Sequence, residues 1–158
     1  MSEKLLDLRA SLLQILDEAI KVDGAVKGNV QLFDKSVDGL RIVAQRGFDS
    51  SFMQLFEVVR EDELCPCGRA LRHQRRVVSP DVSSDRLYSP YLLTAQSNGY
   101  QAVQSTPIIG KDGQLKGVFS THFEKVHHLS EKASRALDDC ASKMAQLIAE
   151  NEAELARS

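Results

Sequence analysis

The longest helical periodicity in the first part of the chain lies in residues 5–22. Apolar side chains recur there every seven residues in three adjacent rows, which begin at Leu5, Leu6 and Leu8. This pattern predicts an α-helix whose apolar stripe is wider than one docking face requires. We interpret the surplus as a dimer interface; the alternative is a helix that its own fold buries on both sides. The residues expected to face a second subunit are Leu5, Leu8, Leu12, Ile15 and Ala19.

Alternating and short apolar runs predict an antiparallel sheet in the middle of the chain. Turn-forming residues join the strands in two hairpins, with Asp38-Gly39 in the first and Gly110 to Gly113 in the second. The strand that precedes Pro80 is expected near a sheet edge, because proline cannot donate to a β-ladder. The expected strands span residues 30–33, 40–45, 76–78, 102–109 and 115–123.

Helical spacing returns between and after these strands. Asp49 is well placed to cap one helix, and Ser130 to cap a long C-terminal helix. The tail, residues 150–158, loses the apolar period and is expected to fray. Residues 79–99 form a long, polar, turn-rich connection, which is typical of a functional segment with short helices of its own. The other helices are expected over residues 50–60, 67–73 and 133–148.

The order of these elements predicts a single α+β domain. We divide it into an N-terminal helix (1–24), a core (25–128) and a C-terminal helix with its tail (129–158). A chain of 158 residues leaves no room for a second, catalytic domain. If the protein signals, we therefore expect its output on another chain or on a part that has been removed.

Composition narrows the function classes. Twenty Lys and Arg against 22 Asp and Glu give a net charge of -2, which argues against nucleic acid or an anionic membrane as a partner. No run of 18 apolar residues and no secretory signal are present. Three cysteines without a framework spacing favour a reducing compartment, so we expect a cytoplasmic protein.

Several segments resemble the GAF domain family, in the family's order. They are residues 28–33 (GNVQLF), 40–48 (LRIVAQRGF), 67–71 (CGRAL), 77–82 (VVSPDV), 101–108 (QAVQSTPI) and 115–123 (LKGVFSTHF). Together the resemblance extends over roughly residues 26–148, and it is greatest to the GAF domains of bacterial sensor histidine kinases.

This resemblance implies a six-stranded antiparallel sheet with the terminal helices on one face and loops and short helices on the other. It also implies a small-ligand pocket under those loops, a homodimer formed through the terminal helices, and a role in two-component signal transduction, with a kinase as a possible separate output protein. By position, the pocket candidates are Cys67, Asp81, Tyr88, Tyr91, Tyr100, Ser105, Thr121 and His122.

Cys65-Pro66-Cys67 is the most reactive-looking motif in the sequence. Two thiols just before a helix could form a redox disulfide, and exposure would make them a redox sensor. The alternative is one loop cysteine and one buried cysteine that packs as a small hydrophobe. A zinc site is disfavoured because no second ligand pair stands at a companion spacing.

One enzyme class on this fold needs separate consideration. Free methionine-(R)-sulfoxide reductases are GAF proteins of similar size, and Cys67-Gly68 resembles their Cys-Gly motif. Those enzymes need a further cysteine in the segment before the fourth strand, and residues 79–101 contain none. Cys140, on the C-terminal helix, is not a clear substitute. We therefore expect no catalytic residues.

Other ligands are not identified by motif. The signatures of cyclic GMP-binding and bilin-binding members are absent, so both are disfavoured and no cofactor is expected. The basic cluster from Arg69 to Arg76 could steer an anion, although a solvated helix end is the simpler interpretation. His122, His127 and His128 fit structural or surface roles better than a metal site.

We interpret the chain as a non-catalytic sensory or regulatory module. Two alternatives remain open at this point. One is a thiol-redox protein, either of the reductase type or a sensor based on Cys65 and Cys67. The other is a pure interaction protein with a filled pocket.

Overall fold

The computed structural model describes residues 2–157. Its helices are α1 (Glu3–Lys21), α2 (Ser50–Leu55), α3 (Pro66–His73), α4 (Leu92–Asn98) and α5 (Glu131–Arg157), with 3₁₀ turns η1 (Val22–Gly24) and η2 (Arg86–Tyr91). Its strands are β1 (Lys27–Asp34), β2 (Gly39–Arg46), β3 (Val77–Ser79), β4 (Ala102–Ile109) and β5 (Leu115–Phe123).

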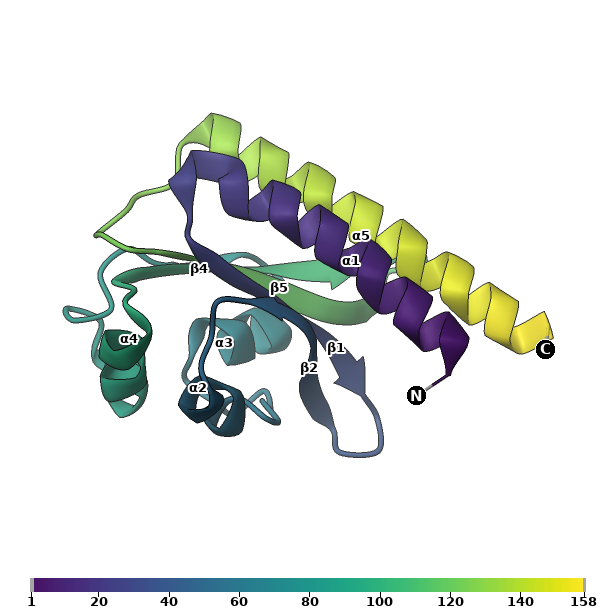
Figure 1. Ribbon diagram of the computed structural model, residues 1–158, viewed down its shortest axis with the longest axis horizontal. Helices are drawn as coiled ribbons and strands as arrows, with labels where there is room; N and C mark the ends of the chain where they lie inside the picture. Colours follow the sequence, from purple (N-terminus) through teal and green to yellow (C-terminus); the bar gives the residue numbers. More distant parts are fainter. Residues whose placement is uncertain (1, 158) are drawn as a thin grey trace.

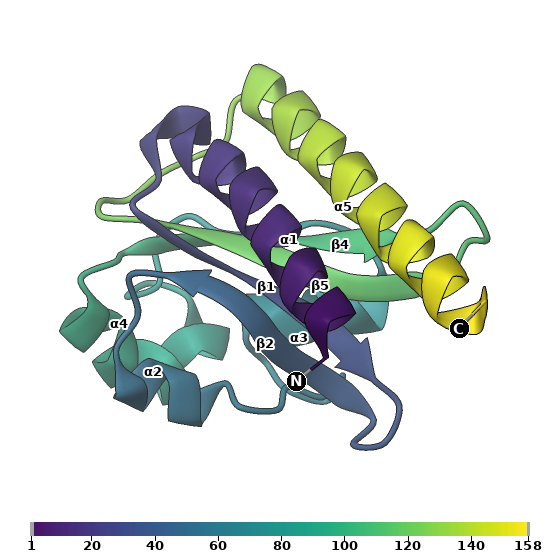
Figure 2. The same ribbon diagram turned by 45° about the vertical axis from the view of Figure 1, so that its right-hand side comes forward.

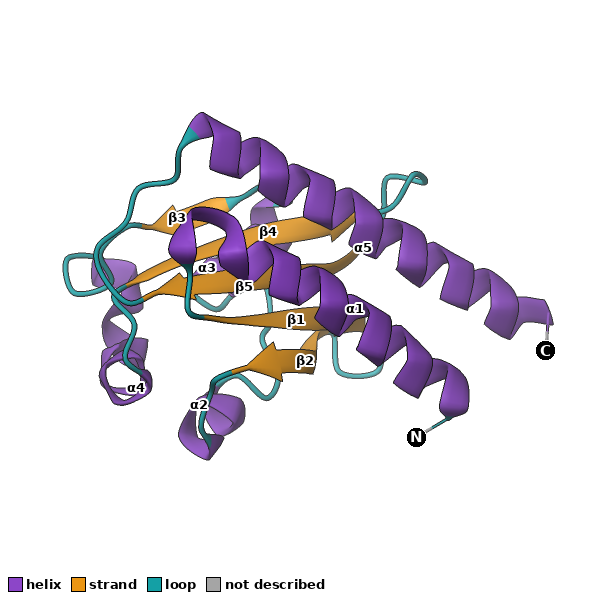
Figure 3. Ribbon diagram, turned by 45° about the horizontal axis from the view of Figure 1, so that its top comes forward, coloured by secondary structure: helices purple, strands orange, loops and turns teal. Residues whose placement is uncertain are grey.

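The strands form one antiparallel sheet in the order β2-β1-β5-β4-β3, and β3 lies at an edge as predicted (Figure 3). Helices α1 and α5 cover one face. Helices α2, α3 and α4 with η2 lie on the other face, and we call these four elements the cover (Figure 1). The predicted α+β class and the two faces are therefore confirmed.

Alternation along the central strands fills a separate core on each face of the sheet. On β5, Phe119 points to the terminal helices, whereas its neighbour Val118 points to the cover. The helix-side core consists of Leu8, Leu12, Ile15, Leu16, Ala19, Val30, Ala44, Ile108, Phe119, Leu137, Cys140, Met144, Ala145 and Ile148. The cover-side core consists of Leu40, Phe48, Phe52, Phe56, Val59, Cys65, Cys67, Ala70, Val82, Tyr88, Tyr91, Ala95, Tyr100, Val103 and Val118.

The terminal helices lie side by side and antiparallel on the sheet (Figure 2). Four of the five residues expected at a dimer interface, Leu8, Leu12, Ile15 and Ala19, are buried in the helix-side core. The interpretation of these four as dimer contacts is wrong, because α5 and the sheet already cover them. Leu5 is 37% exposed, and Leu6 in the next row is 48% exposed.

The C-terminal tail is helical, which corrects the expected fraying. Helix α5 continues to Arg157 because polar contacts replace the missing apolar ones. Lys116 Nζ donates to Glu152 at 3.3 Å, and Asn151 Nδ2 donates to the Lys4 carbonyl oxygen at 3.3 Å. No helix within residues 2–157 combines the length and apolar content that a membrane span needs.

The described residues form five strands, whereas the resemblance implied six. The helix expected over residues 50–60 ends at Leu55, and the chain then meets edge strand β2 at a single point. Leu40 and Val59 exchange two backbone hydrogen bonds of 2.8 and 3.0 Å, after which the chain turns at Arg60. In place of the sixth strand that the resemblance implied, this segment forms one isolated β-bridge to β2.

We predict that Leu12→Ala lowers the free energy of unfolding by about 2–5 kcal/mol, because Leu12 is fully buried between α1 and the sheet. The control Gln14→Ala, at an exposed position of the same helix, should change it by less than about 0.5 kcal/mol. Urea denaturation of both variants measures this difference. Equal losses in the two variants would contradict the placement of α1.

Candidate functional site

A small cavity lies between the cover and the sheet. It offers about 10 Å³ to the centre of a water-sized molecule, which is room for about one water. Its walls come from β1, β4 and β5 on the sheet side and from α2, η2 and the start of α3 on the cover side. The lining residues are Asn29, Gln31, Phe52, Phe56, Cys65, Pro66, Cys67, Tyr88, Val103, Ser105, Ser120 and His122.

Strand register brings the polar lining residues together. Asn29 on β1 and Ser105 on β4 both stand opposite Ser120 on β5, so the three form one row across the sheet. The Ser105 and Ser120 hydroxyl oxygens are 2.6 Å apart and share a hydrogen bond. His122 follows two residues after Ser120 and therefore shares its face. The sheet thus presents a polar floor to a largely aromatic cover.

Several polar atoms on this floor have no partner. Among the described residues, the buried side-chain atoms without a hydrogen bond are Asn29 Oδ1, Gln31 Oε1, Gln31 Nε2 and His122 Nδ1. All three residues line the cavity. A buried polar group left unpaired costs about 1–3 kcal/mol, so such a cluster calls for a functional explanation.

His122 is held neutral by its surroundings. Its ring packs edge-on against Phe48 and Tyr100, with centroid distances of 4.8 and 4.6 Å. Burial, with a smaller contribution from Lys27, lowers the pKa of His122 to about 3. The imidazole therefore offers the cavity a neutral ring that can both donate and accept hydrogen bonds.

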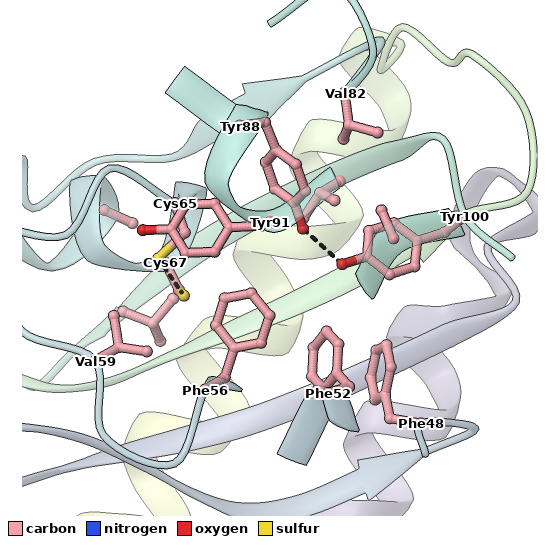
Figure 4. Close-up of a cluster of buried hydrophobic side chains, with 14 of the residues drawn as sticks. Phe48, Phe52, Phe56, Val59, Cys65, Cys67, Val82, Tyr88, Tyr91 and Tyr100 are labelled. Carbon is pink, nitrogen blue, oxygen red and sulfur yellow. Dashed lines mark hydrogen bonds between the residues drawn. The ribbon is translucent and has the colours of Figure 1, made fainter. Parts of the chain in front are cut away.

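The cover contributes an aromatic wall with its own hydrogen bonds. Figure 4 shows the Tyr88 and Tyr100 hydroxyl groups facing each other, at an O–O distance of 2.6 Å. Burial raises the pKa of both phenols, so each stays protonated. Phe48 and Phe52 stack at 3.7 Å beside them. The phenol pair ties η2 to the start of β4 above the cavity.

The two cysteines of the Cys65-Pro66-Cys67 motif meet at the N-terminus of α3. Their sulfur atoms are 3.4 Å apart (Figure 4), and both side chains are buried. The hydrogen bond from the Cys67 thiol favours a Cys65 thiolate, so the pKa of Cys65 is lowered. The same hydrogen bond and burial raise the pKa of Cys67. The expectation that these two thiols are exposed is wrong, since both are buried and line the cavity.

Among the residues that the structure describes, no Asp, Glu, Lys or Arg side chain lines the cavity. The basic cluster predicted beside it does not converge there. Arg69 pairs with Asp85 at 3.3 Å, and Arg76 pairs with Asp138 on α5. Because these two guanidinium groups are engaged elsewhere, neither supplies a positive charge to the cavity.

The sequence-predicted pocket residues divide into three groups. Cys67, Tyr88, Ser105 and His122 line the cavity. Two others, Tyr91 and Tyr100, belong to the cover-side core around it. The last two lie elsewhere, and they are Asp81, which accepts hydrogen bonds from Ser83 and Ser84, and Thr121, which accepts one from Gln104 on the helix side.

Thr121 is misplaced in that prediction because it alternates with His122, so the two cannot share a face. The residues missed by sequence reasoning include Asn29 and Gln31. Their signal was present, since they alternate with Val30 and Leu32 along a buried strand. Ser120 could have been found in the same way, two residues before His122.

The remaining histidines and the third cysteine lie away from the cavity. His127 contacts Asp23 at 3.0 Å and stacks on Phe123, and His128 is exposed. Within residues 2–157, no three His, Cys, Asp or Glu side chains gather as a metal site would require. Cys140 belongs to the helix-side core, across the sheet from Cys65 and Cys67.

Comparisons with known proteins show which family has this fold. The family model described as GAF domain matches residues 6–149. A comparison with curated proteins finds no match.

Solved structures share the fold at low identity. A domain assigned to a two-component sensor histidine kinase of Sinorhizobium meliloti 1021 is 19% identical, covers 96% of this chain and 94% of its own, and has a TM-score of 0.73. A GAF domain/HD domain protein from Geobacter sulfurreducens is 17% identical, with coverages of 94% and 95% and a TM-score of 0.75.

The type II free methionine-R-sulfoxide reductase of Thermoplasma acidophilum is also similar. It is 18% identical, covers 94% of this chain and 96% of its own, and has a TM-score of 0.73. At such identities these likenesses establish the fold.

We predict that His122 makes the protein less stable as pH falls below neutrality. The folded state holds this pKa at about 3, against 6.5 for an ordinary histidine. Between these values the unfolded state binds more protons, so the free energy of unfolding decreases with falling pH. From pH 7 to pH 5 this residue should account for a loss of about 2 kcal/mol.

Urea denaturation at the two pH values should show that His122→Gln removes this part of the loss. His128→Gln, at an exposed position, should retain it. Identical pH profiles for wild type and His122→Gln would show that the ring is not buried as described.

Proposed function

The chain belongs to the GAF domain family, and on that premise we propose that it is a non-catalytic sensory or regulatory module of bacterial signal transduction. We propose further that it binds a small ligand in the cavity under the cover and signals through its terminal helices. The observation that carries this proposal is the cluster of unpartnered polar atoms on Asn29, Gln31 and His122, all of which line one cavity. A ligand that paired with them would recover the hydrogen bonds that they lack.

The lining favours an uncharged ligand that carries both donors and acceptors. The Asn29 and Gln31 oxygens accept, whereas the Gln31 amide nitrogen donates. An anion would be buried beside no cation, which is unfavourable. The cyclic phosphate of cyclic GMP is therefore disfavoured by the site's electrostatics as well as by motif, and bilin stays disfavoured because no cysteine lies in residues 79–101.

Binding of anything larger than water requires the cover to move. Phe52, Phe56 and Tyr88 close the cavity from the cover side. They belong to short elements joined by loops, which open more easily than the sheet. A ligand shifts this equilibrium only if it binds the open arrangement better than the closed one.

Arg76 could transmit a movement of the cover to the terminal helices. It stands between α3 and β3, where the chain leaves the cover for the sheet edge. Its guanidinium donates to Thr106 Oγ1 at 2.9 Å, to the Ser134 carbonyl oxygen at 3.2 Å and to Asp138. A displacement of α3 would therefore be passed to α5 through the planar guanidinium group of Arg76.

We also propose how the protein passes its signal to other molecules. A homodimer through the terminal helices would use the exposed part of α1 around Leu5 and Leu6, and a separate kinase is a possible partner. The cysteine content and charge fit a cytoplasmic protein without a nucleic-acid or membrane partner.

A thermal-shift comparison of matched pairs tests the ligand class. We expect nicotinamide or uracil to raise Tm more than nicotinate, which has a carboxylate in place of the carboxamide, or orotate, which adds a carboxylate to uracil. A ligand at 100 times its Kd contributes about 2.7 kcal/mol, or about 5–10 °C in Tm at this chain length. Stabilisation by the carboxylates alone, or by none of the four at millimolar concentration, would contradict the proposed ligand class.

Gln31→Met should abolish that response and at the same time stabilise the ligand-free protein. Methionine has a similar volume and removes two unpartnered polar atoms, so we expect a gain of about 1–3 kcal/mol. The matched control Gln54→Met, at an exposed position of α2, should change neither quantity. A destabilised Gln31→Met variant would mean that the amide serves packing and not binding.

Arg76→Gln should separate ligand binding from signalling. Hydrogen exchange of wild-type protein with a stabilising ligand from the panel should change protection in α1 and α5. The variant should keep the thermal shift but lose the change in α5, because its link to Ser134 and Asp138 is gone. An undiminished response in α5 would exclude Arg76 as the connection.

A further inference from the structure

We propose that Cys65 and Cys67 form a thiol–disulfide pair that water-sized hydroperoxides oxidise inside the cavity. The two sulfur atoms lie 3.4 Å apart, and both residues line the cavity wall. The third cysteine, Cys140, lies across the sheet in the helix-side core. Among the cysteines, all of which the structure describes, only Cys65 and Cys67 are therefore close enough to pair.

The cavity selects the oxidant by size and polarity. Its interior accepts about one water-sized molecule, and hydrogen peroxide is only slightly larger. The unpartnered atoms of Asn29, Gln31 and His122 supply donors and acceptors to a molecule that has both. Because both cysteines are less than one-tenth exposed, an oxidant that cannot enter the cavity does not reach them.

Cys65 is the attacking residue. It is the N-cap residue of α3, where the helix dipole favours a negative charge. The Cys67 thiol can donate to the Cys65 sulfur, and this hydrogen bond lowers the pKa of Cys65, with a smaller contribution from the Gly68 backbone N–H. The thiolate is the reactive form of a cysteine, so Cys65 reacts first.

The reaction balances in two steps. The Cys65 thiolate attacks one peroxide oxygen, so that an S–O bond forms and the O–O bond breaks, and the departing hydroxide takes a proton to become water. The Cys67 sulfur then attacks the sulfenic sulfur, so that the S–S bond forms and the S–O bond breaks, and the departing hydroxide takes the Cys67 thiol proton to leave as a second water. Two thiols lose two electrons to one peroxide, and a small-molecule thiol reverses the change by exchange.

Oxidation must reshape the cavity wall. A disulfide needs its sulfur atoms about 2.05 Å apart, so residues 65–67 have to move together at the start of α3. The oxidation itself does not depend on the proposed function. Its effect on ligand binding does rest on that function, because it supposes that the same cavity holds the ligand.

The experiment treats the full chain with hydrogen peroxide, blocks remaining thiols and digests with trypsin. Peptide 61–69 carries both cysteines, and we expect it to lose the mass of two hydrogen atoms and regain it with dithiothreitol. Cys67→Ser should stop at a sulfenic acid that dimedone traps at Cys65. The control Cys140→Ser should form the disulfide at the wild-type rate.

Access is tested with cumene hydroperoxide, which is too large for the cavity. We expect it to oxidise peptide 61–69 at least about tenfold more slowly than hydrogen peroxide does. Equal rates would overturn the proposal, as would a peptide that stays reduced in folded wild-type protein. If the disulfide forms while no ligand of the panel shifts Tm, the proposed ligand class fails and the thiol pair stands.

Discussion

The register of β1, β5 and β4 is the constraint on which the rest of the structure depends. It places Asn29, Ser120 and Ser105 in one row on the cover side, while the alternate residues Val30 and Phe119 enter the helix-side core. A slip of one residue would exchange these sets and bury the polar row under α1 and α5. The helices, the cavity and the thiol pair that faces it therefore all follow from one pairing of strands.

The two faces of the sheet treat their buried polar groups differently. On the helix side, Gln104 donates to Thr121, accepts from Thr106, and Thr106 in turn accepts from Arg76, so the chain of hydrogen bonds is complete. On the cover side, four buried side-chain atoms within residues 2–157 have no hydrogen-bond partner. Since each costs about 1–3 kcal/mol and a domain is stable by about 5–15 kcal/mol, packing alone does not account for the second arrangement. The incomplete face is where function is expected.

Much of the fold could be predicted from the sequence, and the predictions that were wrong failed for physical reasons. The bounds of β4 and β5 and the edge position of β3 follow from alternation and turn chemistry, which are local. Burial of Leu12 and Ile15 depends on α5, more than a hundred residues away, so periodicity could not tell a dimer face from an internal one. Tail helicity rests on Lys116, which is 36 residues from its partner Glu152, and on Lys4, which is 150 residues from Glu154. The polar floor was readable on β1, but Asn29 and Gln31 carry amides, which belong to no catalytic or metal-binding motif that would single them out.

The start of α3 joins the chemistry of the cavity to the helices. The thiol pair sits at the first turn of α3, and Arg76 follows its last turn by only three residues. Helix α3 has eight residues and packs on β4 and β5, so a shift at its start is expected to carry the whole helix. A ligand that displaces the cover and an oxidant that draws two sulfurs together would therefore act on the same rigid element. Because Arg76 connects that element to Ser134 and Asp138, both inputs would reach α5 by the same hydrogen bonds.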